Sequence, residues 1–321
     1  EIPLRLVGSE MCIRDSNNTP TVEGTAEANS LITLFIDGNN SNITSVTNID
    51  GIFSITSGVL SDNIYLITVT STDSAGNISS YSDELSLTVD TLAPSNPVIT
   101  TDTTLTNNNS PTIEGTAEIG STITLFVDGV SSNITALTNS QGNFSITSAE
   151  LSDNNYSFTV TATDSNGNIS IASNELIIEI DTISPNQPII TTTTSSTNSN
   201  TPTIEGTAEV NSIITLFVNN NNSNITAMTN SEGNFSITSS ELTDDTYSLT
   251  VTSTDAAGNI SNTSNALSLT IDTTPPSKPV ITTTTNVTSN NSLVIEGSGD
   301  AGTLITLLIN GFSSNLTATV N

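Results

Sequence analysis

The sequence predicts an all-β chain made of tandem antiparallel sandwiches, and three observations support this fold class. The first is a repeat: Gly24, Gly115, Gly206 and Gly297 each follow a glutamate, and successive copies lie 91 residues apart. The second is the alternation of apolar and polar residues over short runs, and the third is the turn chemistry between those runs. A period this long indicates whole small domains strung along one chain, because solenoid repeats are usually shorter.

The period divides the chain into five segments. Residues 17–91 form repeat 1, which lacks its first strand, and residues 92–182 and 183–273 form repeats 2 and 3. Residues 274–321 begin repeat 4, whose last strands are missing, so we expect this part to be the least stable. Residues 1–16 align with no repeat, hold both arginines and the single cysteine, and resemble a translated sequencing-adapter read-through. We therefore expect a non-native leader followed by a fragment of a longer array.

Repeat 2 is complete and serves as the template for the strands. Short strands are expected over Thr112–Ala117, Ile134–Thr138 and Asn143–Thr147. A longer strand is expected over Ser121–Asp128, where Ile, Leu and Val alternate with threonines. Period-two alternation with β-branched residues is typical of a strand that is buried on one face.

Two more strands complete the repeat. In Tyr156–Thr163 the side chains of Tyr156, Phe158, Val160 and Ala162 share one face, and in Glu175–Asp181 three aliphatic residues do. Glycine-containing turns, such as Asp128-Gly129 and Asn166-Gly167-Asn168, supply residues that tolerate positive φ. Short strands separated by turns every 8 to 12 residues predict an immunoglobulin-like sandwich, an architecture of seven strands of which these are six.

A leucine and a tyrosine before the longest strand suggest the tyrosine corner of that architecture. The pair is Leu151 with Tyr156 in repeat 2, and it recurs as Leu60 with Tyr65 and as Leu242 with Tyr247. The alternative is that these are simply core residues. Either reading leaves the fold class unchanged.

Composition excludes several classes of function. A net charge of −29 on 321 residues repels nucleic acid and anionic membranes, and should attract cations. No run of 18 apolar residues occurs, so no membrane insertion is expected. With no histidine, no cysteine outside the leader and one lysine, Lys278, nucleophilic catalysis lacks a base, and we expect no enzyme, no catalytic residue and no organic cofactor. No disulfide can stabilise the repeats, and a metal is the usual substitute in small extracellular domains.

Strand order places acidic side chains at the junctions between repeats, because the last strand of one sandwich ends where loops of the next begin. The first junction gathers Asp90, Glu118 and Asp164. The second gathers Asp181, Glu209 and Asp255, and the third gathers Asp272 and Asp300. Oxygen donors without histidine or cysteine favour a hard cation, so we expect Ca²⁺ at these junctions, with Asn166 or Asn168 as a further ligand.

Other interpretations of the same residues remain open. An aspartate before a Gly-Asn turn commonly caps its own loop, and a linker aspartate can simply begin the Asp-Thr bend. Asp62, Asp153 and Asp244 precede the longest strand at the opposite pole and could join the junctions. Asp37 and Asp128 become Asn219 and Asn310 in later copies, so they are interpreted as turn residues.

Four runs of repeat 2 carry a resemblance: P-T-I-E-G-T-A-E from residue 111, I-T-L-F-V-D-G from 123, Y-S-F-T-V-T-A-T-D from 156 and I-D-T from 180. Together they resemble the bacterial Ig-like domains of large secreted and surface adhesins. The resemblance covers residues 17–321. It implies an extracellular stalk segment on the bacterial cell surface that extends a distal binding domain. It also implies calcium between domains and contacts with neighbouring repeats of the same chain.

The alternative is a set of accessory or carbohydrate-binding modules of a secreted polysaccharide hydrolase. Such modules need exposed aromatic side chains on one sheet face. Only 12 Phe and Tyr residues are present, and most fall on core positions of the alternating pattern. The exceptions are Phe35, Phe126 and Phe217, which occupy positions of the alternating pattern that face away from the core.

Overall fold

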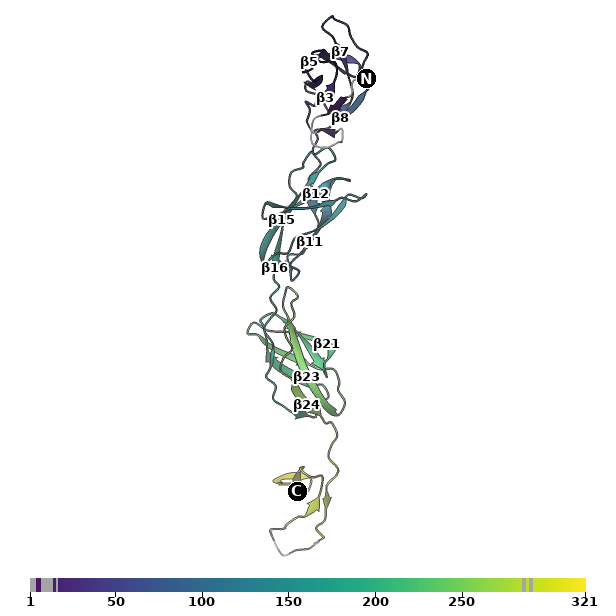
Figure 1. The fold of residues 1–321 in the computed structure, drawn as a ribbon. Coiled ribbons are helices and arrows are strands. Elements are labelled where there is room, and N and C mark those ends of the chain that lie inside the picture. The colour runs from purple at the N-terminus through teal and green to yellow at the C-terminus, as the bar shows by residue number, and fades with distance from the viewer. Residues whose placement is uncertain (1–3, 7–13, 16, 285–286, 289–290) are drawn as a thin grey trace. The chain divides into compact units, whose positions relative to one another are not determined.

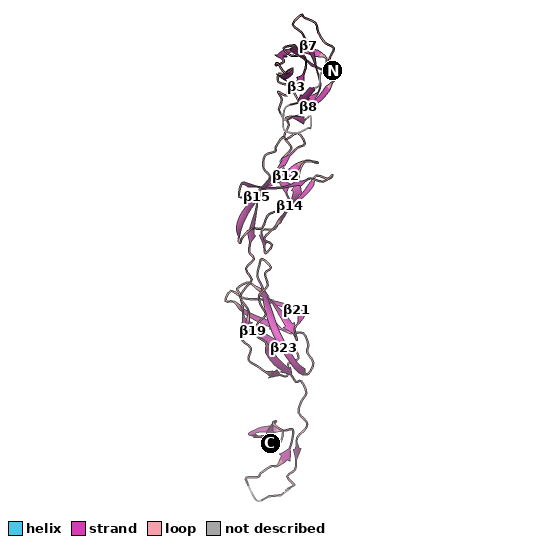
Figure 2. Cartoon of the chain, in the orientation of Figure 1, coloured by secondary structure: helices cyan, strands magenta, loops and turns pink. Residues whose placement is uncertain are grey.

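The computed structural model describes residues 4–6, 14–15, 17–284, 287–288 and 291–321. These residues form β-strands, turns and loops, with no α-helix among them (Figure 2). The chain divides into two compact units, Glu1–Ile183 and Ser184–Asn321, which are described separately. The predicted all-β class is confirmed: the structure holds tandem immunoglobulin-like sandwiches, each formed by a three-stranded and a five-stranded sheet.

The first unit contains repeats 1 and 2 (Figure 1). In repeat 1 the smaller sheet has the order β1-β3-β6 and the larger sheet β2-β8-β7-β4-β5. The bounds of these strands are β1 Leu4–Leu6, β2 Arg14–Asp15, β3 Thr21–Thr25, β4 Leu31–Ile36, β5 Asn39–Val46, β6 Ile52–Thr56, β7 Asn63–Thr72 and β8 Leu85–Val89.

Repeat 2 has the same topology, with sheets ordered β14-β11-β9 and β10-β16-β15-β12-β13. Its strands are β9 Val98–Ile99, β10 Leu105–Thr106, β11 Thr112–Thr116, β12 Thr122–Val127, β13 Val130–Leu137, β14 Asn143–Thr147, β15 Asn154–Thr163 and β16 Leu176–Ile180. All six strands predicted for this repeat are present, with ends shifted by up to four residues. Strands β9 and β10 are only two residues long, too short for an alternating pattern to reveal.

The second unit contains repeat 3, with sheets ordered β17-β19-β22 and β18-β24-β23-β20-β21, followed by two small sheets, β25-β26 and β27-β28. The strands of repeat 3 are β17 Ile189–Ile190, β18 Ser196–Thr197, β19 Thr203–Thr207, β20 Ile213–Val218, β21 Asn221–Met228, β22 Asn234–Thr238, β23 Asp245–Thr254 and β24 Leu267–Ile271. The last four are β25 Val280–Ile281, β26 Gly297–Ser298, β27 Leu304–Ile309 and β28 Phe312–Thr319. No described side chain of these last four strands is fully buried.

Each complete repeat has its own apolar core, made by the inward residues of both sheets. In repeat 2, Phe158, Val160 and Ala162 of β15 are completely buried, as their shared face predicts. Ile113 from the smaller sheet belongs to the same cluster. Burial alternates along the strands because successive side chains point to opposite faces. The positions occupied by Phe35 and its two counterparts are half-buried on the outer face of the larger sheet.

The tyrosine corner, a bond from the tyrosine hydroxyl to upstream backbone, is present in repeats 1 and 3, and in repeat 2 the tyrosine bonds an upstream side chain instead. The Tyr65 hydroxyl donates to the Ser61 carbonyl oxygen at 2.9 Å, and the Tyr247 hydroxyl donates to the Thr243 carbonyl at 3.2 Å. The Tyr156 hydroxyl bonds the Ser152 hydroxyl at 3.1 Å. These tyrosine rings also pack against the cores, so both interpretations of the residues hold.

Two short segments of the leader pair with the sheets of repeat 1. Leu4–Leu6 pairs antiparallel with β3, and Arg14–Asp15 pairs parallel with β8. That residues 1–16 are a non-native leader stays a prediction. Strands β9 and β10 pair at the same two sheet edges in repeat 2. An open edge offers backbone groups that any extended segment can pair with, which is why side-chain alignment gave no sign of this pairing. The rest of the leader, with Cys12, lies outside the described residues.

Candidate metal site at the repeat junctions

The linker that leaves repeat 1 begins at Asp90, directly after β8, and is held by repeat 2. The Asp90 Oδ1 accepts from the Leu92 N–H at 3.1 Å, so this aspartate does begin a local bend. Its Oδ2 accepts from the Asn166 side-chain amide at 2.5 Å, and its backbone oxygen accepts from the Asn168 amide at 2.9 Å. The loop after β15 is therefore hydrogen-bonded to the linker through two asparagine side chains.

Asp164 follows β15 and organises that loop. Its Oδ1 accepts from the backbone N–H groups of Asn166 at 2.7 Å and Asn168 at 2.9 Å, the loop-capping arrangement left open by the sequence. Its Oδ2 accepts from the Asn168 amide nitrogen at 2.8 Å. The same nitrogen thus joins a carboxylate oxygen of Asp164 to the backbone oxygen of Asp90. Asp90 and Asp164 are brought together, as predicted, with Asn168 between them.

One polar atom of this junction has no partner. The Asn166 Oδ1 is buried and accepts no hydrogen bond from the described residues. A buried acceptor without a partner is unfavourable by about 1–3 kcal/mol. Asn168 beside it is 9% exposed, so the amides of the loop are largely removed from solvent. The sequence named both asparagines as further ligands but gave no sign of their bonds to the linker.

The other predicted ligands are placed differently. The Glu118 side chain is exposed, and its backbone oxygen accepts from the hydroxyls of Ser121 and Thr138. In the described part of the chain, no three carboxylate, histidine or cysteine side chains lie close enough together to hold a metal ion. Any ion at this junction would therefore need amide and backbone oxygens as well.

The later junctions repeat parts of the arrangement. Asp255 accepts from the Asn259 N–H at 2.8 Å and from its amide at 2.9 Å, so its loop copies that of Asp164. The exposed Glu209 lies in the same unit, whereas Asp181 belongs to the first unit and accepts from Ile183 N–H at 3.0 Å. Among the third pair, Asp272 accepts from the Thr274 N–H at 3.1 Å and Asp300 from the Ser277 N–H at 2.6 Å. Each of these two carboxylates thus bonds linker backbone.

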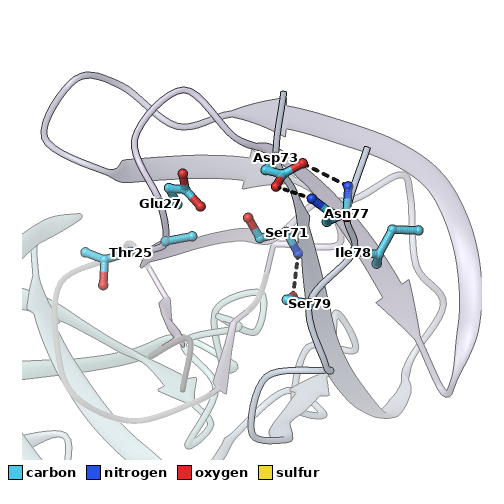
Figure 3. A pocket seen from close by; sticks show the side chains of 8 residues that line it. Thr25, Glu27, Ser71, Asp73, Asn77, Ile78 and Ser79 are labelled. Atoms are coloured by element: carbon cyan, nitrogen blue, oxygen red, sulfur yellow. Dashed lines mark hydrogen bonds between the residues drawn. The ribbon is translucent and has the colours of Figure 1, made fainter. Parts of the chain in front are cut away.

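The equivalent loop of repeat 1 lies at the edge of a hollow of about 560 Å³. Figure 3 shows Asp73 bonded to the Asn77 side chain and backbone there, with Glu27 across the hollow. The pKa of Asp73 is lowered, first by the hydrogen bond from the Asn77 side chain and then by backbone N–H groups. Glu27 and Asp73 are the counterparts of Glu118 and Asp164, so the hollow is the first repeat's version of the junction surface.

A second linker contact involves the three aspartates that the sequence left open as junction residues, and their threonine partners were not foreseen. Asp153 accepts from both the N–H and the hydroxyl of Thr182, at 3.0 and 2.8 Å. Asp62 with Thr91 and Asp244 with Thr273 make the same pair of bonds. Each of these aspartates thus fixes the threonine of the Asp-Thr linker that leaves its own repeat. The signal was available in the sequence, because aspartate and threonine both recur at the 91-residue period.

Hydrogen bonding also sets the acidity of one of these aspartates. The pKa of Asp244 is lowered, chiefly by the Thr273 hydroxyl, then by the Thr273 N–H and the Thr274 hydroxyl. All three donors stabilise the ionised carboxylate. The carboxylates at this pole are therefore used to hold the linker.

Comparison with protein families identifies the repeats. Residues 14–91, 98–182 and 190–273 each match the family described as bacterial Ig-like domain. These segments cover most of the chain, so the chain belongs to the bacterial Ig-like domain family, which confirms the resemblance drawn from the sequence. No curated protein matches the chain. Within the described ranges, the structure has no helix that is long and apolar enough to cross a membrane.

Among solved structures, the chain is similar to the tetra-tandem repeat in the extending region of a large adhesion protein, at 21% identity over 85% of this chain and 74% of the other, with a TM-score of 0.29. It is also similar to fibronectin(III)-like modules of Clostridium thermocellum CbhA, at 12% identity over 56% and 94%, with a TM-score of 0.41. The chicken CNTN1 FN1–FN3 domains match at 11% identity over 84% and 97%, with a TM-score of 0.37. At these values the likenesses carry no argument about function.

Proposed function

We propose that this chain is a structural, non-enzymatic stalk segment of a bacterial surface or secreted adhesin, which carries a distal binding domain away from the cell. The observation that carries this proposal is the hydrogen bonding of the linker by both neighbouring repeats. Asn166 and Asn168 of repeat 2 donate to Asp90, and Asp62 of repeat 1 accepts from Thr91 of the same linker. The start of this linker is therefore bonded by the repeat before it and by the repeat after it, and such a linker favours a chain of repeats that resists bending.

Length follows from the strands. Strand β15 has ten residues, and at about 3.3 Å per residue such a strand spans roughly 33 Å. Repeats joined end to end would each add a length of this order to the stalk. Paired prolines restrict the linkers further, as Pro94 and Pro97 do between repeats 1 and 2.

We also propose that Ca²⁺ stiffens the junctions. At the first junction the ion would be held by oxygens of Asp90 and Asp164, with the amide oxygens of Asn166 and Asn168 and water completing the shell. Two observations support this donor set. The Asn166 Oδ1 is buried without a partner. The Asp90 backbone oxygen and the Asp164 Oδ2 both accept from the Asn168 amide nitrogen, so these two oxygens lie around a single atom. Recurrence of the aspartates at the 91-residue period extends the proposal to Asp272 with Asp300.

Small-angle scattering on the whole chain tests the stalk, and calcium titration tests the ion. In calcium we expect a longer maximum dimension than in chelator, because bound ions cancel the repulsion between carboxylates. A chain that is compact in both conditions would contradict the stalk. A chain that is extended in both, with no heat of calcium binding, would contradict the ion alone.

Asn166→Ala removes one proposed ligand, and it installs the residue that repeats 1 and 3 carry at this position, Ala75 and Ala257. Extracellular modules bind calcium at roughly 0.1–1 mM. At 10 mM calcium, a site with a dissociation constant of about 1 mM stabilises the folded state by roughly 1.4 kcal/mol. We expect Asn166→Ala to reduce this calcium-dependent gain. The stability in chelator is measured separately, because the substitution removes both the bond to Asp90 and the buried acceptor that has no partner.

A further inference from the structure

One tyrosine departs from the period of the chain. Of the four tyrosines, Tyr65, Tyr156 and Tyr247 are the corner residues and recur every 91 residues. Tyr81 has no such counterparts, because Ala172 and Thr263 occupy the equivalent positions. It is 58% exposed, so the core of repeat 1 does not require it.

Tyr81 lines a hollow of about 510 Å³ on the outer face of the larger sheet of repeat 1. Its ring meets the ring of Phe35 edge to face, with centroids 5.0 Å apart and planes at 85°, which fixes the ring orientation. Leu66, 43% exposed, adds an aliphatic surface to the same hollow. A volume of this size lies in the range of small-molecule sites.

Two carboxylates, Asp37 and Glu84, also line the hollow, and no cationic side chain does. Asp37 is held in place because its Oδ1 accepts from the Leu66 N–H at 2.8 Å. The Glu84 carboxylate accepts no hydrogen bond from the described residues. Its counterpart in repeat 2, Glu175, accepts from the Ser157 hydroxyl at 2.5 Å.

The difference between the two repeats has a simple cause. Leu66 stands in repeat 1 where Ser157 stands in repeat 2, so the substitution that removes the hydroxyl partner of Glu84 also adds apolar surface beside it. Repeat 3 has neither acid, with Asn219 and Ala266 at these positions. The tyrosine, the leucine and the unengaged glutamate therefore occur together in repeat 1 alone.

We propose that this hollow binds an amino sugar unit of a polysaccharide, a pyranose that carries a free ammonium group. The C–H face of the ring packs on Tyr81 and Leu66, and the ammonium group pairs with Glu84 and Asp37. A cation over or beside an aromatic ring gains further electrostatic attraction. The strongly negative chain favours a cationic sugar over a neutral one and repels uronic acids.

Binding of a glucosamine oligomer to the whole chain, followed by NMR or calorimetry at about 0.15 M salt, tests this site. That ionic strength screens diffuse attraction to the acidic surface. We expect one site per chain. Tyr81→Ala introduces the residue that repeat 2 has at the equivalent position, Ala172, and should weaken binding roughly three- to tenfold. Glu84→Gln should weaken it about two- to fivefold.

Two comparison ligands and one gain-of-function variant decide the chemistry. Equal binding of an N-acetylglucosamine oligomer of the same length would overturn the ammonium contact. If tetralysine binds as tightly as the glucosamine oligomer and its binding also depends on Tyr81, the site recognises ammonium groups without a sugar ring. If Tyr81→Ala does not weaken binding of the glucosamine oligomer, the oligomer does not bind at this hollow. The double variant Ser157→Leu with Ala172→Tyr should create the site in repeat 2 and raise the stoichiometry from one to two; an unchanged stoichiometry would show that these residues do not define it.

Discussion

Replacing Gly115 by alanine should destabilise repeat 2, because the added Cβ would clash with neighbouring atoms. The φ angle of Gly115 is not positive, so the clash alone accounts for the effect. A Cβ at Gly115 would lie 2.2 Å from the Val98 carbonyl oxygen and 2.5 Å from the ring of Phe144. Ordinary contacts begin near 3.4 Å, so the chain must move by about 1 Å. The carbonyl belongs to the backbone of β9 and cannot rotate away as a flexible side chain can.

The magnitude follows from two opposing effects. Overpacking of this kind costs typically about 1–3 kcal/mol. The alanine also restricts the unfolded chain, which stabilises the folded state by roughly 0.4–1 kcal/mol. A net loss of about 1–2 kcal/mol remains. For a domain of this size each kcal/mol lowers the Tm by roughly 4–8 °C, so we expect a drop of about 4–16 °C for repeat 2.

Hydrogen exchange followed by mass spectrometry isolates this effect within the whole chain. Amides of β11 and β14 should exchange roughly 5- to 30-fold faster in Gly115→Ala, while peptides of repeat 3 provide an internal control. Gly58→Ala is the matched variant, because its nearest atom lies 4.0 Å from the added Cβ and its φ is not positive. Unchanged exchange in β11 and β14 would refute the steric explanation for the recurring Glu-Gly pair.

Three further predictions concern the core, the corner and the linker. Phe158→Ala, at a fully buried position, should cost repeat 2 about 3–5 kcal/mol and remove its urea transition at a concentration where repeat 3 stays folded; a retained transition would show that the ring is dispensable. Tyr247→Phe removes the bond to the Thr243 carbonyl and should lower the stability of repeat 3 by about 0.5–1.5 kcal/mol in urea unfolding, so an equal midpoint would argue against the corner. The lowered pKa of Asp244 means that its ionised form stabilises the fold above the unfolded pKa of about 3.9 and that this contribution is lost as pH falls through the folded pKa. Asp244→Asn should therefore be less stable than the parent chain at pH 7, and the difference should shrink as the pH falls below the unfolded pKa; a difference that grows on acidification would contradict this sign.

Strand positions and inward faces could be predicted because side-chain direction alternates along a strand. The run from Tyr156 to Thr163 placed Phe158, Val160 and Ala162 in the core, and all three are completely buried. Alternation carries no information about segments of two residues. Strands β9 and β10 were therefore not located, although backbone bonds fix them to β11 and β16.

The junction was predicted only in part. Strand order brought Asp90 to the loop that begins at Asp164, and the structure joins these residues through the Asn168 amide. Glu118 belongs to the same pole, but its side chain is exposed, because topology places a residue at a pole without fixing where its side chain turns. The Asp62–Thr91 pair was missed for the same reason, since 29 residues separate its members.

The sequence by itself determined the period, the sandwich architecture, the acidic character and the family, since all of these follow from residue type and local spacing. Only the tertiary structure decided which atoms meet: the ring of Phe144 against Gly115, the asparagine amides on the linker, and Tyr81 beside Phe35 above a glutamate without a serine partner. Such contacts join residues far apart along the chain. Their geometry depends on the packing of two sheets, which local patterns do not encode.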